Sequence, residues 1–263
     1  MSSKPSLYPF RLIPLFSISS VITLVFIVEY LFVYVSAVLG IILALACAMA
    51  IYAVTSLVNL KTEVSEALET MALLFIYVLM VSSLPWFFFG QGFLIPAVYS
   101  VVLGICLAYI YQRNIPFERL GFTKTNLLRR ALVGSILGVP AGSIEYFILR
   151  PTPLYPDFRP TYFFQILLYM MLFVGLGEEL LFRSLIQRSL EGAYGDKVGL
   201  VLGALIFAIM HLTWRSVPEI IFVFFAGLIL GYTFQKTGSL VTPVFMHAIN
   251  NTVLMAVMPF LPI

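Results

Sequence analysis

The chain has 263 residues, of which 61% are hydrophobic and only 10% are charged. Soluble domains carry about 25% charged residues, so this composition excludes an ordinary soluble domain and predicts an integral, multi-pass membrane protein. The net charge is +3 and the basic residues are scattered, which excludes the basic domain of a nucleic-acid-binding protein. The two cysteines, Cys47 and Cys106, lie in apolar runs and do not form a disulfide or metal-binding pattern.

Apolar runs long enough to cross the hydrocarbon core of a membrane, about 20 residues each, recur along the whole chain. The predicted spans are Leu12–Val28, Leu31–Val54, Met71–Phe89, Phe93–Tyr111, Ala131–Leu149, Thr161–Ile186, Val198–Leu212, Ile220–Phe234 and Val241–Leu261. The first two are nearly continuous and together too long for one crossing, so we expect a tight hairpin near Glu29. The fold class is therefore all-α, a polytopic transmembrane helical bundle of about eight or nine spans.

Lysine and arginine residues predict the orientation, because they gather on the cytoplasmic side of membrane proteins. With the N-terminus in the cytoplasm, eleven of them lie inside and three lie outside. The polar loop 112–130 is then cytoplasmic, the Pro-rich segment Arg150–Pro160 is external, and the C-terminus lies outside.

Ionisable residues within spans are costly, at about 2.5 to 3.5 kcal/mol each, and are therefore candidates for function. Glu178, Glu179 and Arg183 lie inside the sixth apolar run. Adjacent helix positions point about 100° apart, so the two glutamates cannot face the same direction. We expect Glu179 to pair with Arg183 and Glu178 to face a cavity.

Two further polar groups follow in separate spans. His211 ends the apolar run that contains Phe207, and His247 precedes Asn251 by four residues, which places both on one helix face. Separately, each has an ordinary structural explanation, such as an interhelical hydrogen bond. Together, a glutamate, two histidines and an asparagine are the groups that activate water and stabilise an oxyanion, which predicts an intramembrane polar site.

At these residues the sequence resembles the CAAX protease and bacteriocin-processing family, which includes the Ras-converting CAAX prenyl endopeptidases. The family pattern EExxxR, FxxxH, HxxxN appears in order as Glu178-Glu179-x-x-x-Arg183, Phe207-x-x-x-His211 and His247-x-x-x-Asn251. The resemblance implies a catalytic core at residues 161–263, after N-terminal spans at 1–160 that carry no motif, and both parts are expected to form one integral domain.

The resemblance also implies a role for each motif residue. Glu178 would be the general base, and His211 would help to hold the water. His247 and Asn251 would form the oxyanion hole. Glu179 and Arg183 would position the site, while Phe207 would pack beside His211.

The implied reaction is hydrolysis of a peptide bond in a peptide or a lipid-anchored or membrane-anchored protein, within membrane lipids and without a cofactor. A zinc-dependent protease using the same glutamate and histidines is the first alternative, although the sequence lacks HExxH and zinc does not explain Asn251. A proton-coupled transporter and a non-catalytic membrane protein, such as an immunity protein, are the others.

Overall fold

The computed structural model describes residues 12–83 and 91–262, and the part of the chain that it describes contains helices and no strands. The N-terminal helices are α1 (Leu12–Tyr30) with its π-helical extension Leu31–Val35, α2 (Ala37–Leu57), α3 (Thr62–Ser83) and α4 (Gln91–Arg113). They are followed by α5 (Leu127–Leu149), α6 (Pro160–Tyr169), α7 (Leu176–Glu179), α8 (Arg188–Tyr194), α9 (Asp196–Ile209), α10 (Val217–Thr237) and α11 (Val241–Ala256). Short 3₁₀ turns lie at Leu212–Trp214 and Met258–Phe260.

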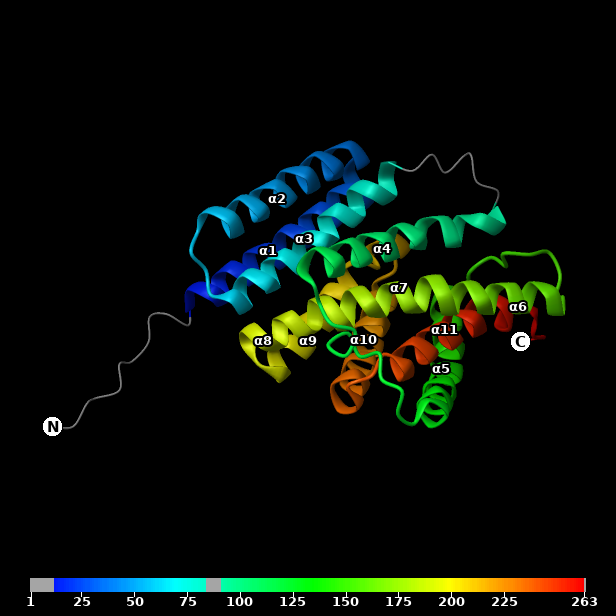
Figure 1. Cartoon of the computed structure of the whole chain (residues 1–263). Coiled ribbons are helices and arrows are strands. Elements are labelled where there is room, and N and C mark those ends of the chain that lie inside the picture. The colour runs from blue at the N-terminus through cyan, green and yellow to red at the C-terminus, as the bar shows by residue number, and fades with distance from the viewer. Residues whose placement is uncertain (1–11, 84–90, 263) are drawn as a thin grey trace.

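The helices α6, α7 and α8 form one continuous helix through the middle of the molecule (Figure 1). Helices α1 to α4 lie on one side of it, and α5, α10 and α11 lie on the other. The central helix is therefore in contact with both halves of the bundle, which is where a site built from several helices can form.

The central helix runs from Pro160 to Tyr194, beyond the predicted boundary at Ile186, because two π-helical segments extend it without breaking it. These segments, Met170–Gly175 and Leu180–Gln187, flank the four residues of α7. Such wider turns change the direction of side chains within a helix and are frequent at functional sites. The two adjacent glutamates lie between them.

The predicted hairpin near Glu29 is wrong in position. The first helix continues through Glu29 to Val35, and the chain reverses at Ser36, whose backbone is extended and whose hydroxyl accepts a hydrogen bond from the amide of Leu39. Glu29 is buried by the neighbouring helices rather than exposed in a turn. Gly40 permits the reversal, because a Cβ there would lie 2.7 Å from Cβ of Phe32.

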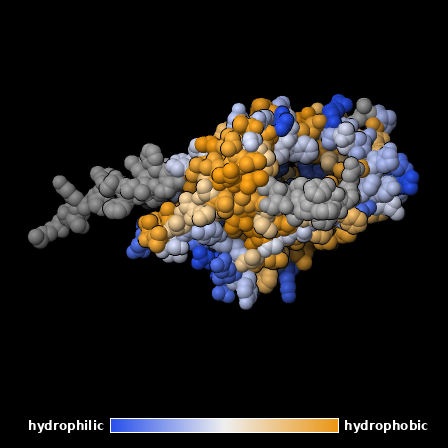
Figure 2. Space-filling view, turned by 90° about the horizontal axis from the view of Figure 1, so that it is seen from above, coloured by the Kyte–Doolittle hydropathy of each residue, from blue (hydrophilic) through white to orange (hydrophobic). Residues whose placement is uncertain are grey.

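Eight of the described helices are long and apolar enough to cross a membrane, in agreement with an integral, multi-pass protein. Helix α3 is not among them, since Glu63, Glu66 and Glu69 lie in its first half. The predicted span Met71–Phe89 ends in residues 84–90, which lie outside the described residues. In Figure 2, apolar residues form a broad band across the molecule, and hydrophilic residues gather mainly at its right-hand end and lower edge.

Helix α5 packs backbone to backbone against α11, the helix that carries His247 and Asn251. Its buried residues Gly134, Gly138 and Gly142 repeat every four positions on one face. A Cβ at Gly138 would lie 2.5 Å from the carbonyl oxygen of Met246, and the other two glycines meet α11 as closely. The three glycines therefore set the position of the third motif, in the way that small residues allow close helix packing in membranes.

The loop after α4 is shorter than predicted, because α4 extends to Arg113 and α5 begins at Leu127. It is held against the central helix by a hydrogen bond of 2.6 Å from the hydroxyl of Ser184 to the carbonyl oxygen of Leu120.

Candidate active site

The two adjacent glutamates of α7 point into different surroundings, as their positions on a helix require. Glu179 is completely buried among side chains, whereas Glu178 reaches the wall of a cavity. The distinction matters chemically, because only a carboxylate beside open space can contact a water molecule or a substrate.

Both oxygens of the Glu179 carboxylate are bonded by residues of two motifs. Oε2 accepts a hydrogen bond of 2.9 Å from Nε of Arg183, one turn along the same helix, and Oε1 lies 2.8 Å from Nδ1 of His247 on α11. Since a carboxylate oxygen accepts, Nδ1 of His247 carries a proton. Nε2 of the same ring lies 3.8 Å from Oε2 of Glu178, too far for a hydrogen bond in this arrangement.

The ring of Phe207 packs at the centre of this network. It lies 4.7 Å from the ring of His211, 5.8 Å from that of His247 and 4.9 Å from that of Phe182, between ring centroids. The guanidinium of Arg183 lies over the Phe207 ring at 4.7 Å, and its two terminal nitrogens have no hydrogen-bond partner among the described residues. The aromatic face therefore compensates the part of the Arg183 charge that Glu179 does not reach.

A cavity of about 120 Å³ lies beside Glu178, and His211 forms another part of its wall. This volume has room for several water molecules. The remaining wall comes largely from α1, α3, α4 and the turn after α9. Among the described residues, the wall includes neither His247 nor Asn251, so the first and second motifs share this space while the third lies behind Glu178.

The tautomer of His211 follows from its neighbour. Nδ1 lies 2.8 Å from the carbonyl oxygen of Phe207, one turn earlier, and a carbonyl oxygen only accepts. Nδ1 therefore carries the proton, and Nε2 of the neutral ring is left as an acceptor.

Asn251 lies one turn beyond His247 on α11 and is half-buried. Its amide oxygen accepts a hydrogen bond of 3.1 Å from Nδ2 of Asn250, which leaves its own amide nitrogen as a donor. Asn250 also donates to Glu145 of α5, so a buried hydrogen bond joins α5 to α11 beside the third motif.

The structure adds three residues to the surroundings of Glu178 that the motifs do not include. Tyr99 on α4, Tyr77 and Glu29 line the same cavity, and the hydroxyl of Tyr99 is close enough to interact electrostatically with Glu178. Glu29 carries a signal in the sequence, as a carboxylate in an apolar run, which the expected hairpin accounted for as a turn residue. Tyr77 and Tyr99 carry no signal of function in the sequence, since tyrosine is ordinary in a membrane helix.

The donor groups present do not fit a zinc site. Within residues 12–83 and 91–262, no three histidine, cysteine, aspartate or glutamate side chains are grouped to hold a metal ion. His247 and Glu179 are bonded to each other, and Glu178, His211 and Glu29 on the cavity wall are not grouped closely enough to supply the three protein ligands of a catalytic zinc. Independence from a cofactor stays a prediction.

Residues 160–253 match the family model of the type II CAAX prenyl endopeptidases described as Rce1-like. The matched segment begins at the start of α6 and contains all three motifs, and it confirms the family that these motifs indicate. The chain is thus an integral membrane protein whose residues 160–253 are similar to a family of CAAX prenyl endopeptidases. No curated protein and no solved structure matches the chain.

Proposed function

We propose that this protein is an intramembrane endopeptidase that hydrolyses a peptide bond with water activated by Glu178. The observation that carries the proposal is the unequal placement of the two glutamates. Glu179 is enclosed by Arg183 and His247, while Glu178 shares a water-sized cavity with His211. Glu178 is therefore the carboxylate of the pair with access to water.

In the proposed first step, a water in the cavity donates one hydrogen bond to Glu178 and the other to Nε2 of His211. Glu178 takes the proton as the hydroxide attacks the carbonyl carbon of the substrate. The resulting tetrahedral intermediate collapses when Glu178 passes that proton to the leaving amine. General-base catalysis of this kind contributes roughly 10²- to 10⁴-fold to the rate.

The oxyanion would be stabilised from α11. Glu178, Glu179 and Arg183 together carry one excess negative charge, which is balanced when His247 is an imidazolium. Its Nε2 then carries a proton on the side facing Glu178, where a substrate oxygen can accept it. The free amide nitrogen of Asn251 is the second proposed donor, and it reaches the substrate when α11 and the central helix adjust around it.

The family model that matches residues 160–253 describes CAAX prenyl endopeptidases, which supports a prenylated CAAX protein as the proposed substrate. A membrane-anchored protein or peptide also suits a cavity enclosed by apolar helices, because its anchor can partition into the lipid beside the scissile bond. A prenylated CAAX peptide is accordingly the first probe to use.

The proposal is tested by comparing the membrane proteomes of cells that carry the natural protein, Glu178→Gln or the control Glu63→Gln. Glu63 is an exposed glutamate at the start of α3. A precursor that keeps its C-terminal residues only in the Glu178→Gln cells supports the proposal and identifies the substrate. Identical processing in all three cell lines contradicts it.

A further inference from the structure

A second cavity lies at the end of the bundle where α5 begins and α10 ends. It has a volume of about 370 Å³ and is separate from the cavity beside Glu178. Three basic side chains line it, Arg129, Arg130 and Lys236, and the described residues of its wall include no acidic one. The remaining polar wall consists largely of hydroxyl groups, of which those of Thr233 and Thr237 donate to carbonyl oxygens of their own helix.

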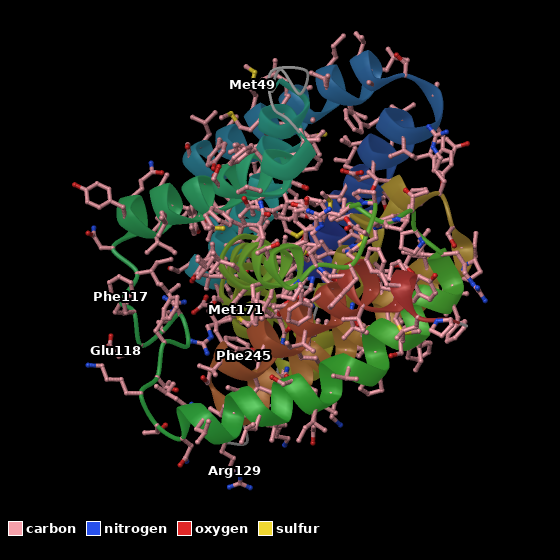
Figure 3. All side chains as sticks on the ribbon, turned by 90° about the vertical axis from the view of Figure 1, so that its right-hand side faces the viewer. Met49, Phe117, Glu118, Arg129, Met171 and Phe245 are labelled. Atoms are coloured by element: carbon pink, nitrogen blue, oxygen red, sulfur yellow. The ribbon has the colours of Figure 1, made fainter. Side chains whose placement is uncertain are left out.

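The basic groups differ in how they are held. The guanidinium of Arg130 donates to the hydroxyl of Thr123 and, at 3.1 Å, to the carbonyl oxygen of Thr237, so it is fixed in the wall. Arg129 extends outward from the first turn of α5 (Figure 3), and Lys236 lies over the ring of Tyr232 at 5.4 Å. One cation is therefore preorganised, while two exposed cations can close on a ligand.

The start of α5 lies at this cavity, because Asn126 and Arg129 form part of its wall. Asn126, the residue before the helix, has a left-handed backbone and its side chain does not cap the helix. The first amides of an uncapped helix keep their donors free and carry partial positive charge, and both features favour phosphate groups.

Exposed apolar side chains continue from the cavity along both helices. Val133 and Tyr232 form part of its wall, and Ile136 and Ile229 lie three residues further along the same helix faces, exposed at 69% and 45%. The basic end of this surface matches the headgroup of an anionic phospholipid, and the long apolar surface below it matches the acyl chains. A soluble anion would contact only the basic end.

We propose that this cavity binds the phosphate headgroup of an anionic phospholipid, whose acyl chains lie along the exposed apolar faces of α5 and α10. Clusters of basic residues at the membrane surface attract such lipids, and each basic charge raises the affinity about fivefold. Because α5 packs through its glycines against α11, a lipid bound here would also stabilise the helix pair that carries the third motif.

The test uses the full-length protein in neutral detergent, with native mass spectrometry as the measurement. The probes are short-chain phosphatidylglycerol, short-chain phosphatidylcholine and inorganic phosphate. The pocket variant is Arg129→Gln with Lys236→Gln, and the control is Lys61→Gln with Lys197→Gln, which removes the same charge from exposed positions outside the cavity wall. Melting temperatures establish that each variant is folded.

The natural protein should prefer phosphatidylglycerol over phosphatidylcholine. The pocket variant should bind phosphatidylglycerol about 25-fold more weakly, and the control should bind it normally. Equal binding of the two lipids by the natural protein, or equal losses in both variants, would overturn the proposal. Inorganic phosphate that binds as tightly as phosphatidylglycerol would show a site for a free anion and overturn the lipid assignment.

Discussion

Nδ1 of His247 donates a hydrogen bond across 2.8 Å to Oε1 of Glu179, and both side chains are buried. This bond joins α11 to the short α7 segment at the centre of the long helix. It also fixes the ring so that Nε2 faces Glu178. Glu179 is thus a positioning residue that orients the proposed oxyanion donor, while its neighbour Glu178 is left to contact water.

Removing Arg183 should destabilise the protein strongly. In Arg183→Leu, the buried carboxylate of Glu179 loses the guanidinium at 2.9 Å, and breaking such a buried pair costs about 3 to 5 kcal/mol. The expected result is a clear fall in the melting temperature in detergent. Removing both charges, as Glu179→Leu with Arg183→Leu, should recover part of the stability but not the cleavage activity. An unchanged melting temperature for Arg183→Leu would contradict this account of the pair.

Alanine at Gly138 should disturb the packing of α5 against α11. Its Cβ would meet the carbonyl oxygen of Met246 at 2.5 Å, and overpacking of this kind costs about 1 to 3 kcal/mol. We expect a lower melting temperature and slower cleavage, because α11 carries His247. The matched control is Gly104→Ala on α4, where a Cβ meets no atom within 4 Å and stability should be kept. Equal effects of the two substitutions would show that the close approach is unimportant.

Phenylalanine at Tyr99 should slow cleavage without unfolding the protein. The substitution keeps the ring but removes the hydroxyl that interacts with Glu178. An interaction of a hydroxyl with a charged group contributes about 1.5 to 3 kcal/mol, so kcat should fall roughly 10- to 150-fold. Tyr111→Phe removes a hydroxyl from an exposed ring of the same helix and serves as the control. If the Tyr99→Phe enzyme cleaves at the natural rate, the hydroxyl of Tyr99 does not contribute to catalysis.

Removal of metal ions should leave the enzyme active. The reason is that Glu29, Glu178 and His211 share the cavity wall without forming a group that could hold a metal ion, whereas catalytic zinc needs three protein ligands close together. The measurement is the cleavage rate of purified protein before and after exhaustive chelation, together with its zinc content. Stoichiometric zinc that is lost together with activity, and restored with it, would instead support the zinc-dependent alternative.

The sequence predicted those features that cost much free energy in a membrane. A glutamate pair and an arginine inside an apolar run are costly, and this cost singles out Glu178, Glu179 and Arg183 without any structure. The same reasoning predicted the helical membrane class, because no soluble fold buries so much apolar surface. It also predicted different surroundings for Glu178 and Glu179, since adjacent positions on a helix point in different directions.

Other features depend on packing and leave no such signature. The sequences of the π-helical segments around α7 carry no signal for a π-helix, and the apolar run ends at Ile186, so the central helix was predicted to end there instead of at Tyr194. Glu29 resembled a turn residue because its burial depends on helices distant in sequence. Tyr99 gave no signal, since only the approach of α4 to the central helix brings its hydroxyl to Glu178.

The most direct test of Glu178 as the base is the rate at which purified Glu178→Gln cleaves a fluorescent prenylated CAAX peptide or the substrate that proteomics identifies. The amide keeps the size of the side chain but cannot take a proton from water, so we predict a fall in kcat of at least about 100-fold. The melting temperature and the rate of the Glu63→Gln control should stay near those of the natural protein. A folded Glu178→Gln protein that cleaves at the natural rate would contradict the central claim.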